Sequence, residues 1–138
     1  GEVIDYRDWH VQLGRRFRAL KLWFLYRCVG LERLQSMIRH HVQLTQELVS
    51  WIDDDPDWHR VAPTPMTLAC LQHRGGDQVT RDVLQSLNES GSMGLTHCEL
   101  DGRYTIRLSI GQWNTTISHV RAAWDRIVSA GAEFTSSS

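Results

Sequence analysis

Hydrophobic residues recur along this chain with two different spacings, and each spacing predicts one kind of element. A spacing of three to four residues predicts helices over residues 14–29, 31–52 and 77–90. A last helix is expected to begin after Thr115 or Thr116, because either side chain can cap it. The second helix has the clearest apolar stripe, which consists of Leu31, Leu34, Ile38, Val42, Thr45, Leu48 and Ile52.

Alternating patterns and short apolar runs predict four strands, over residues 58–62, 66–73, 95–100 and 103–110. The dipeptide Asp101-Gly102 between the last two strands is typical of a tight hairpin turn. The residues expected to point inward from the last strand are Tyr104, Ile106, Leu108 and Ile110. This order of elements predicts an α+β fold, in which helices pack on one face of a small, mostly antiparallel four-stranded sheet and long helices precede it.

The first helix contains a segment that is hydrophobic on every side. Residues 22–26 read LWFLY, and no single face of a helix accounts for five such residues in a row. A helix of this kind needs protein on all sides. We therefore expect this helix to have a partner, and we expect the chain on its own to self-associate through it.

Charge is distributed unevenly along the 138 residues, although the net charge is only −1. Residues 1–39 hold eight basic and four acidic side chains, whereas residues 40–138 hold seven basic and twelve acidic ones. The basic first helix leaves a second interpretation open, namely a stand-alone helix–sheet binding module that holds an anionic partner. Because its aromatic residues lie on the stripe expected to be buried and the remainder is acidic, we expect no nucleic-acid and no membrane partner.

The sequence contains no self-contained catalytic or metal-binding motif. The spacings CxxC, HExxH and GxSxG and the phosphate-binding P-loop do not occur. Lys21 is the only lysine beside fourteen arginines, so any chemistry that needs a lysine amine has one candidate in this chain. The cysteines, Cys28, Cys70 and Cys98, lie far apart, which favours a reducing compartment and hence a cytoplasmic protein.

Three aspartates after the second helix have the spacing that begins a calcium-binding loop. Asp53, Asp55 and Asp57 lack the glycine and the distal glutamate of such a loop. We interpret them as the solvated end of the helix, which Pro56 terminates.

Residues 5–24 (DYRDWHVQLGRRFRALKLWF) resemble the pyridoxal-phosphate-dependent group II amino-acid decarboxylases, and most of all their aromatic-L-amino-acid decarboxylase branch. Residues 38–42 (IRHHV) resemble the IRxHV helix of this family, and residues 68–71 (LACL) resemble its LVCF strand. Residues 102–110 (GRYTIRLSI) and 119–121 (HVR) resemble its closing hairpin and helix.

The resemblance implies that the chain is the C-terminal part of a fold-type I enzyme. Residues 1–30 would be the end of the large cofactor domain and a linking helix, residues 31–133 the C-terminal small domain, and residues 134–138 a disordered tail. The full-length enzyme would convert an aromatic L-amino acid to its amine and carbon dioxide, as a homodimer. Decarboxylation cannot be separated here from the related oxidative deamination to an aldehyde.

The resemblance also implies which residues carry function. In the family, pyridoxal phosphate is bonded to a lysine that follows a histidine, and that pair lies upstream of the matching segment. Lys21 follows Leu20 instead and matches a structural helix, so the segment is expected to be inactive alone and to hold no cofactor-binding, catalytic or metal-binding residue. Gly14 matches a residue that lines the substrate pocket across the dimer interface, and Arg7 and Trp9 match residues that support the catalytic loop.

Overall fold

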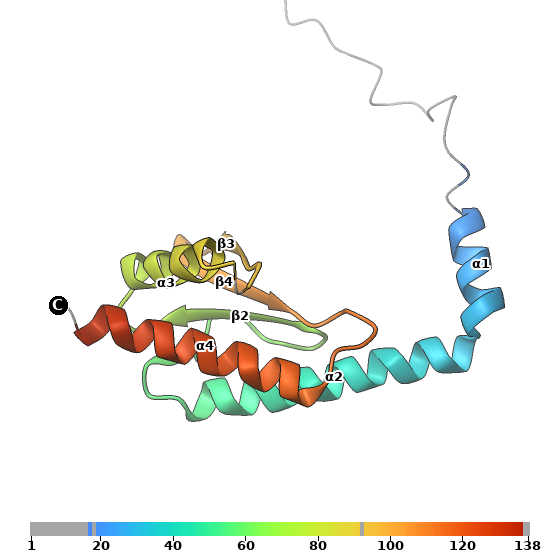
Figure 1. Ribbon diagram of the computed structural model, residues 1–138, viewed down its shortest axis with the longest axis horizontal. Coiled ribbons are helices and arrows are strands. Elements are labelled where there is room, and N and C mark those ends of the chain that lie inside the picture. Colours follow the sequence, from blue (N-terminus) through green and yellow to red (C-terminus); the bar gives the residue numbers. More distant parts are fainter. Residues whose placement is uncertain (1–16, 18, 92, 137–138) are drawn as a thin grey trace, which may run out of the picture. The chain divides into compact units, whose positions relative to one another are not determined.

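The computed structural model describes residue 17, residues 19–91 and residues 93–136. Contacts divide the chain into two compact units, Gly1–Gln35 and Ser36–Ser138. The described elements (Figure 1) are α1 (Ala19–Val29), α2 (Leu31–Asp54), β1 (Trp58–Arg60), β2 (Leu68–His73), α3 (Asp77–Glu89), β3 (Thr96–Leu100), β4 (Arg103–Ser109) and α4 (Ile117–Ser136).

The four strands form one sheet in the order β1-β2-β4-β3, and every neighbouring pair is antiparallel. The expected α+β class is therefore confirmed. The β3–β4 hairpin turns at Asp101 and Gly102, whose φ angles are 51° and 74°. Positive φ at both central residues is the geometry of the tight turn that Asp-Gly favours.

One face of the sheet carries the core. Alternate residues of β2 and β4 on this face, among them Leu71 and Ile106, are fully buried. They pack against hydrophobic residues of three helices, which are Leu44, Leu48 and Ile52 of α2, Val83, Leu84 and Leu87 of α3, and Val120, Trp124, Ile127 and Ala130 of α4. The intervening positions form the other side of the sheet, here named the outer sheet face, which includes His59, Cys70, Gln72, Cys98, Arg103, Thr105 and Arg107.

The apolar stripe expected along α2 is only partly correct. Thr45, Leu48 and Ile52 are fully buried, but Leu31 and Ile38 are 56% and 46% exposed. Only the C-terminal half of this 24-residue helix contributes to the hydrophobic core of Ser36–Ser138. The apolar stripe in the sequence is therefore longer than the part of the helix that is buried. Ile117, the first residue of α4, is likewise hydrophobic and 44% exposed.

The ends of the helices follow local chemistry. Gly30 has φ 83° and separates α1 from α2 as expected. Thr116 precedes α4, and its backbone N–H donates to Nδ1 of His119 at 3.2 Å. The side chain of the third helical residue therefore provides the acceptor for the backbone N–H of the capping residue. The helix α4 continues to Ser136, beyond residue 133 at which we expected the small domain to end.

Candidate functional site

The three residues that the resemblance assigns to the site lie outside the described residues. Arg7, Trp9 and Gly14 precede the first described position, so their roles remain predictions. Lys21 lies on α1 with its side chain exposed, between Leu20 and Leu22.

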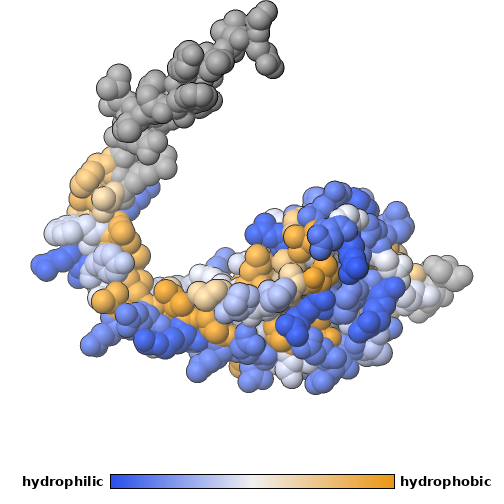
Figure 2. Space-filling view, turned by 180° about the vertical axis from the view of Figure 1, so that it is seen from behind, coloured by the Kyte–Doolittle hydropathy of each residue, from blue (hydrophilic) through white to orange (hydrophobic). Residues whose placement is uncertain are grey.

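The helix α1 carries a run of exposed large hydrophobic residues. None of its eleven residues is buried. Leu22, Trp23, Phe24, Leu25 and Tyr26 are each between 41% and 55% exposed, and Figure 2 shows hydrophobic residues at this surface. Burying one large hydrophobic side chain stabilises a protein by about 1.5–3 kcal/mol, so this run is a strong candidate for a contact surface.

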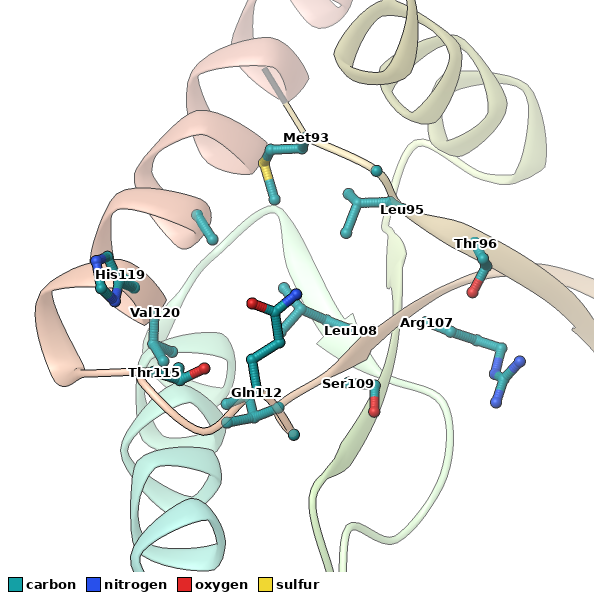
Figure 3. Close-up of a pocket in the computed structure, with 14 residues that line it drawn as sticks. Met93, Leu95, Thr96, Arg107, Leu108, Ser109, Gln112, Thr115, His119 and Val120 are labelled. Carbon is teal, nitrogen blue, oxygen red and sulfur yellow. The ribbon is translucent and has the colours of Figure 1, made fainter. Parts of the chain in front are cut away.

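A hollow of about 400 Å³ opens between the β3–β4 ladder and the first turns of α4. Figure 3 shows Leu108 of β4 pointing toward it. The hydrophobic part of its lining consists of Met93, Leu95, Leu108, Ile110, Val120 and Ala123. This volume is within the range of about 300–1,000 Å³ that small-molecule sites occupy.

The polar lining of this hollow does not form a catalytic set. Its polar residues include His119 and Arg107, but no aspartate, glutamate or cysteine. Nδ1 of His119 already accepts a hydrogen bond from the backbone of Thr116. Neither a pair of carboxylate and histidine nor a thiol with its base can therefore be assembled from these residues.

A buried histidine joins the end of β2 to the helices. His73 is 3% exposed, and its ring lies 4.9 Å from the ring of Trp58 at nearly a right angle. Its Nδ1 accepts a hydrogen bond from the backbone N–H of Gly75 at 2.9 Å. Burial lowers the pKa of His73, although the nearby carboxylates of Asp57 and Asp55 oppose this effect. The ring is therefore held neutral as part of the core.

The aspartates after α2 are engaged with the protein itself. Oδ1 of Asp55 accepts hydrogen bonds from the backbone N–H groups of Asp57 and Trp58. Asp53 binds the guanidinium of Arg60 with both carboxylate oxygens, at 2.8 Å and 2.7 Å. Asp53 and Asp57 are exposed where α2 ends, as expected, and Asp53 and Asp55 also form hydrogen bonds with β1. Within the described part of the chain, no group of three or more His, Cys, Asp or Glu residues could hold a metal ion.

One cluster was missed by the reasoning from sequence. Arg103 and Arg107 lie on the outer sheet face with His59, and Arg74 follows β2 at the same end of the sheet as Arg103. The signal was present, because Arg103 and Arg107 occupy the polar positions of an alternating strand. The pairing of β4 with β2, which brings Arg74 into the cluster, joins segments more than thirty residues apart in the sequence.

Comparison with known proteins gives a consistent result. The family model of the pyridoxal-dependent decarboxylase conserved domain matches residues 1–74. The chain is 37% identical over 133 residues to the aromatic-L-amino-acid decarboxylase of Sus scrofa, covering 96% of this chain and 27% of that protein. It is 36% identical over 129 residues to the phenylacetaldehyde synthase of Arabidopsis thaliana, covering 88% and 26%.

The fold is also shared with solved structures. A crystal structure of Oryza sativa TDC with PLP and tryptamine superposes with a TM-score of 0.82 at 31% identity, over 96% of this chain and 30% of that chain. This chain therefore spans between a quarter and a third of the length of the proteins that it matches. No helix among the described residues is both long enough and apolar enough to span a bilayer.

Proposed function

The chain belongs to the pyridoxal-dependent decarboxylase family, and from that premise we propose that it forms the C-terminal part of a subunit that decarboxylates an aromatic L-amino acid. The share of the relatives that it spans, 27% in the first comparison, supports its being one part of a longer subunit. The C-terminal position rests on the resemblance of residues 102–110 and 119–121 to the closing hairpin and helix of the family. The α+β unit is compact enough to form the last domain of a larger enzyme.

Pyridoxal phosphate is the cofactor on which this family depends, and it supplies an electron sink for the charge left when carbon dioxide departs. The described residues do not fit it. The only lysine, Lys21, projects from a helix whose neighbouring side chains are hydrophobic. A cofactor site would require a lysine amine, a carboxylate for the pyridine nitrogen and donors for the phosphate, and no part of the described chain brings these together. The segment is therefore proposed to be inactive alone.

The role that we propose for this segment is structural. The exposed run 22–26 of α1 would contact the remainder of the subunit or its partner in a homodimer. A helix that is hydrophobic all round is covered in a folded protein, and an interface of this composition resembles a permanent one. We also propose that the enzyme is cytoplasmic, in keeping with three cysteines that form no disulfide among the described residues.

Three residues before α1 are proposed to reach the substrate region of the assembled enzyme. Gly14 would line the pocket for the substrate side chain, where the absence of a side chain leaves room for an aromatic ring. Arg7 and Trp9 would support the catalytic loop. A G14S variant of the assembled enzyme should therefore lose more activity toward bulky aromatic amino acids than toward small ones, whereas an equal loss toward both would remove Gly14 from the pocket.

The placement can be tested by the intact mass of the natural protein and by the sequence that precedes Gly1. A longer polypeptide with a histidine–lysine pair upstream would support the proposal. A natural polypeptide of only these 138 residues with decarboxylase activity would overturn it. Salt-sensitive binding of the chain to nucleic acid or anionic lipid would instead favour the binding-module interpretation.

A further inference from the structure

The hollow between the β3–β4 ladder and α4 is bounded by small residues at three positions. Gly94 lies before β3, Gly111 follows β4, and Ala123 lies on α4. A Cβ added at Gly94 or Gly111 would meet no atom within 4 Å, so the chain does not fill the space beside either glycine. Neither glycine has a positive φ angle. The walls of the hollow therefore contain positions that larger side chains could occupy without backbone strain.

The floor of the hollow is hydrophobic and already in place. Leu108, Ile110 and Val120 are buried members of the hydrophobic core. Met93 and Leu95 are half-buried and pack against the same core. Because β4 and α4 hold this floor, it needs no ligand to form, as is usual for small-molecule sites.

The size of the hollow suits an aromatic ring. A dry apolar cavity of about 150 Å³ in another protein holds one benzene molecule. The hollow measures about 400 Å³ and is open to solvent on one side. It therefore has room for a one-ring or two-ring aromatic group that carries a short polar side chain.

Groups that can donate hydrogen bonds lie at the rim of this floor. Gln112 is exposed, and its side-chain amide forms no hydrogen bond within the described part of the chain. Figure 3 shows this side chain reaching from the loop after β4 toward the space between Leu108 and Val120. Nδ1 of His119 accepts a hydrogen bond from the backbone of Thr116, so the neutral ring carries its proton on Nε2. The amide of Gln112 and Nε2 of His119 are therefore both donors at the rim.

The charges around the hollow favour a negatively charged ligand. Among its described lining residues there is an arginine, Arg107, but no aspartate or glutamate. The guanidinium of Arg107 extends outward in Figure 3, so it makes the mouth positive without filling the hollow. Exposed charges more than about 8 Å apart are largely screened at physiological salt, so this local charge outweighs the net negative charge of the unit. Several acidic side chains line other hollows, beside α3 and α4, namely Asp82, Glu89, Asp125 and Glu133.

We propose that this hollow binds an aromatic carboxylate, whose ring lies on Leu108 and Val120 and whose carboxylate accepts hydrogen bonds from Gln112 and His119 beside Arg107. Burial of the ring supplies most of the affinity, and the few polar groups at the rim supply the selectivity. An aromatic amine of the same shape finds no acid here and is repelled by Arg107. The proposal does not depend on the proposed function, because every residue that it uses lies within Ser36–Ser138.

The test is titration of the ¹⁵N-labelled chain, followed by two-dimensional NMR at pH 7, with three compounds that share one ring system. These are indole-3-acetate, which is an anion, indole, which is uncharged, and tryptamine, which is a cation. The chain carries W23D and L25D, so that the exposed run of α1 does not bind the rings. We expect indole-3-acetate to shift the backbone amides of Gly94, Gly111 and Val120 and to saturate at about 1 mM or below. It should bind about tenfold more tightly than tryptamine.

A pair of variants on α4 places the binding in the hollow. A123F puts a ring into the space and should weaken the binding of indole-3-acetate by about tenfold or more. A122F is the matched control, because Ala122 is exposed on the same helix and does not line the hollow. Its affinity should stay within about twofold of that of the parent chain.

A second pair of variants tests the charge at the rim without changing the floor. Q112E puts a carboxylate at the mouth and should weaken indole-3-acetate about tenfold, while the affinity for uncharged indole stays the same. N114E adds the same charge to the same exposed loop, outside the lining, and should change either affinity by less than about twofold. Both substitutions lie in this loop, so they decide the question even if A123F does not fold.

Four results would overturn the proposal. The first is a set of shifts that do not saturate, and the second is tryptamine binding as tightly as indole-3-acetate. The third is an equal effect within either pair of variants. The fourth is loss of binding in the protein extended upstream to the length of its relatives, because the hollow would then be an internal contact of the larger protein. We expect the extended protein to bind indole-3-acetate with the same affinity as the chain.

Discussion

Asp77 joins three elements of the α+β unit through a single oxygen atom. It is the first residue of α3, and its Oδ1 accepts a hydrogen bond from Nε2 of Gln72 at 2.6 Å and from the backbone N–H of Tyr104 at 3.0 Å. Gln72 lies on β2 and is 6% exposed, and Tyr104 lies on β4. Replacing Asp77 by Ala should therefore detach the start of α3 from two strands at once.

The expected cost follows from these contacts. A hydrogen bond to a charged group contributes about 1.5–3 kcal/mol, and an acidic side chain in the first turn of a helix adds about 0.3–1 kcal/mol. Because the two bonds share one acceptor, their contributions are not additive. We expect D77A to lower the free energy of unfolding by about 2–4 kcal/mol. D77N keeps the accepting oxygen and should cost less than half as much.

The measurement is urea unfolding of the chain, followed by tryptophan fluorescence and circular dichroism. With a slope of about 1–3 kcal/mol per molar urea, D77A should lower the midpoint by about 1–2 M. The matched control is D82A on the same helix, since among the described residues Asp82 accepts a hydrogen bond only from the exposed side chain of Gln78. A surface change of this kind stays within about 0.5 kcal/mol. If D77A and D82A had equal effects, Asp77 would not join the helix to the sheet.

Three further results are expected. Burial lowers the pKa of His73 below its ordinary value of 6.5, so the unfolded state binds more protons than the folded state. The contribution of His73 to stability is therefore complete above pH 6.5 and declines as the pH falls below it. Urea unfolding at a series of pH values should show this decline, and H73Q should show a flatter profile. G131A should destabilise the protein by about 1 kcal/mol, because the new Cβ would lie 3.1 Å from the buried ring of Trp58 and this outweighs the better helix propensity of alanine. A variant that is more stable in thermal unfolding would contradict this. The chain should self-associate in sedimentation velocity, and replacing Trp23 and Leu25 of α1 by Asp should make it monomeric; a monomeric unmodified chain across all concentrations would contradict this.

Local patterns were sufficient to predict most elements of the α+β unit. The alternation in residues 103–110 and the turn at Asp101-Gly102 predicted the hairpin, because strand period and turn conformation are properties of neighbouring residues. Where burial depends on distant contacts, the pattern was insufficient. Ile38 continues the apolar stripe of α2 and is nevertheless 46% exposed, while His41 is polar and buried.

The candidate site was likewise predictable where it depends on neighbouring residues and unpredictable where it depends on distant contacts. That this segment is inactive alone stays a prediction, and it rests on the only lysine of the chain lying in a hydrophobic helix rather than after a histidine. The neighbourhood of Arg74 with Arg103 and Arg107 could not be predicted, because it arises only through the pairing of β2 with β4. Asp77 shows this as well, because its carboxylate binds Gln72 and Tyr104, which lie on two strands distant from each other in the sequence, while Gly76 occupies the cap position of α3 with φ 93°.

We propose that this chain belongs to a larger enzyme whose cofactor lysine lies elsewhere in the polypeptide. The most direct test is borohydride reduction of the protein with pyridoxal phosphate, for the 138-residue chain and for the extended protein, followed by peptide mapping. The account predicts a stoichiometric adduct only in the extended protein, on a lysine upstream of Gly1 that follows a histidine. A stoichiometric adduct on Lys21 of the 138-residue chain would contradict it.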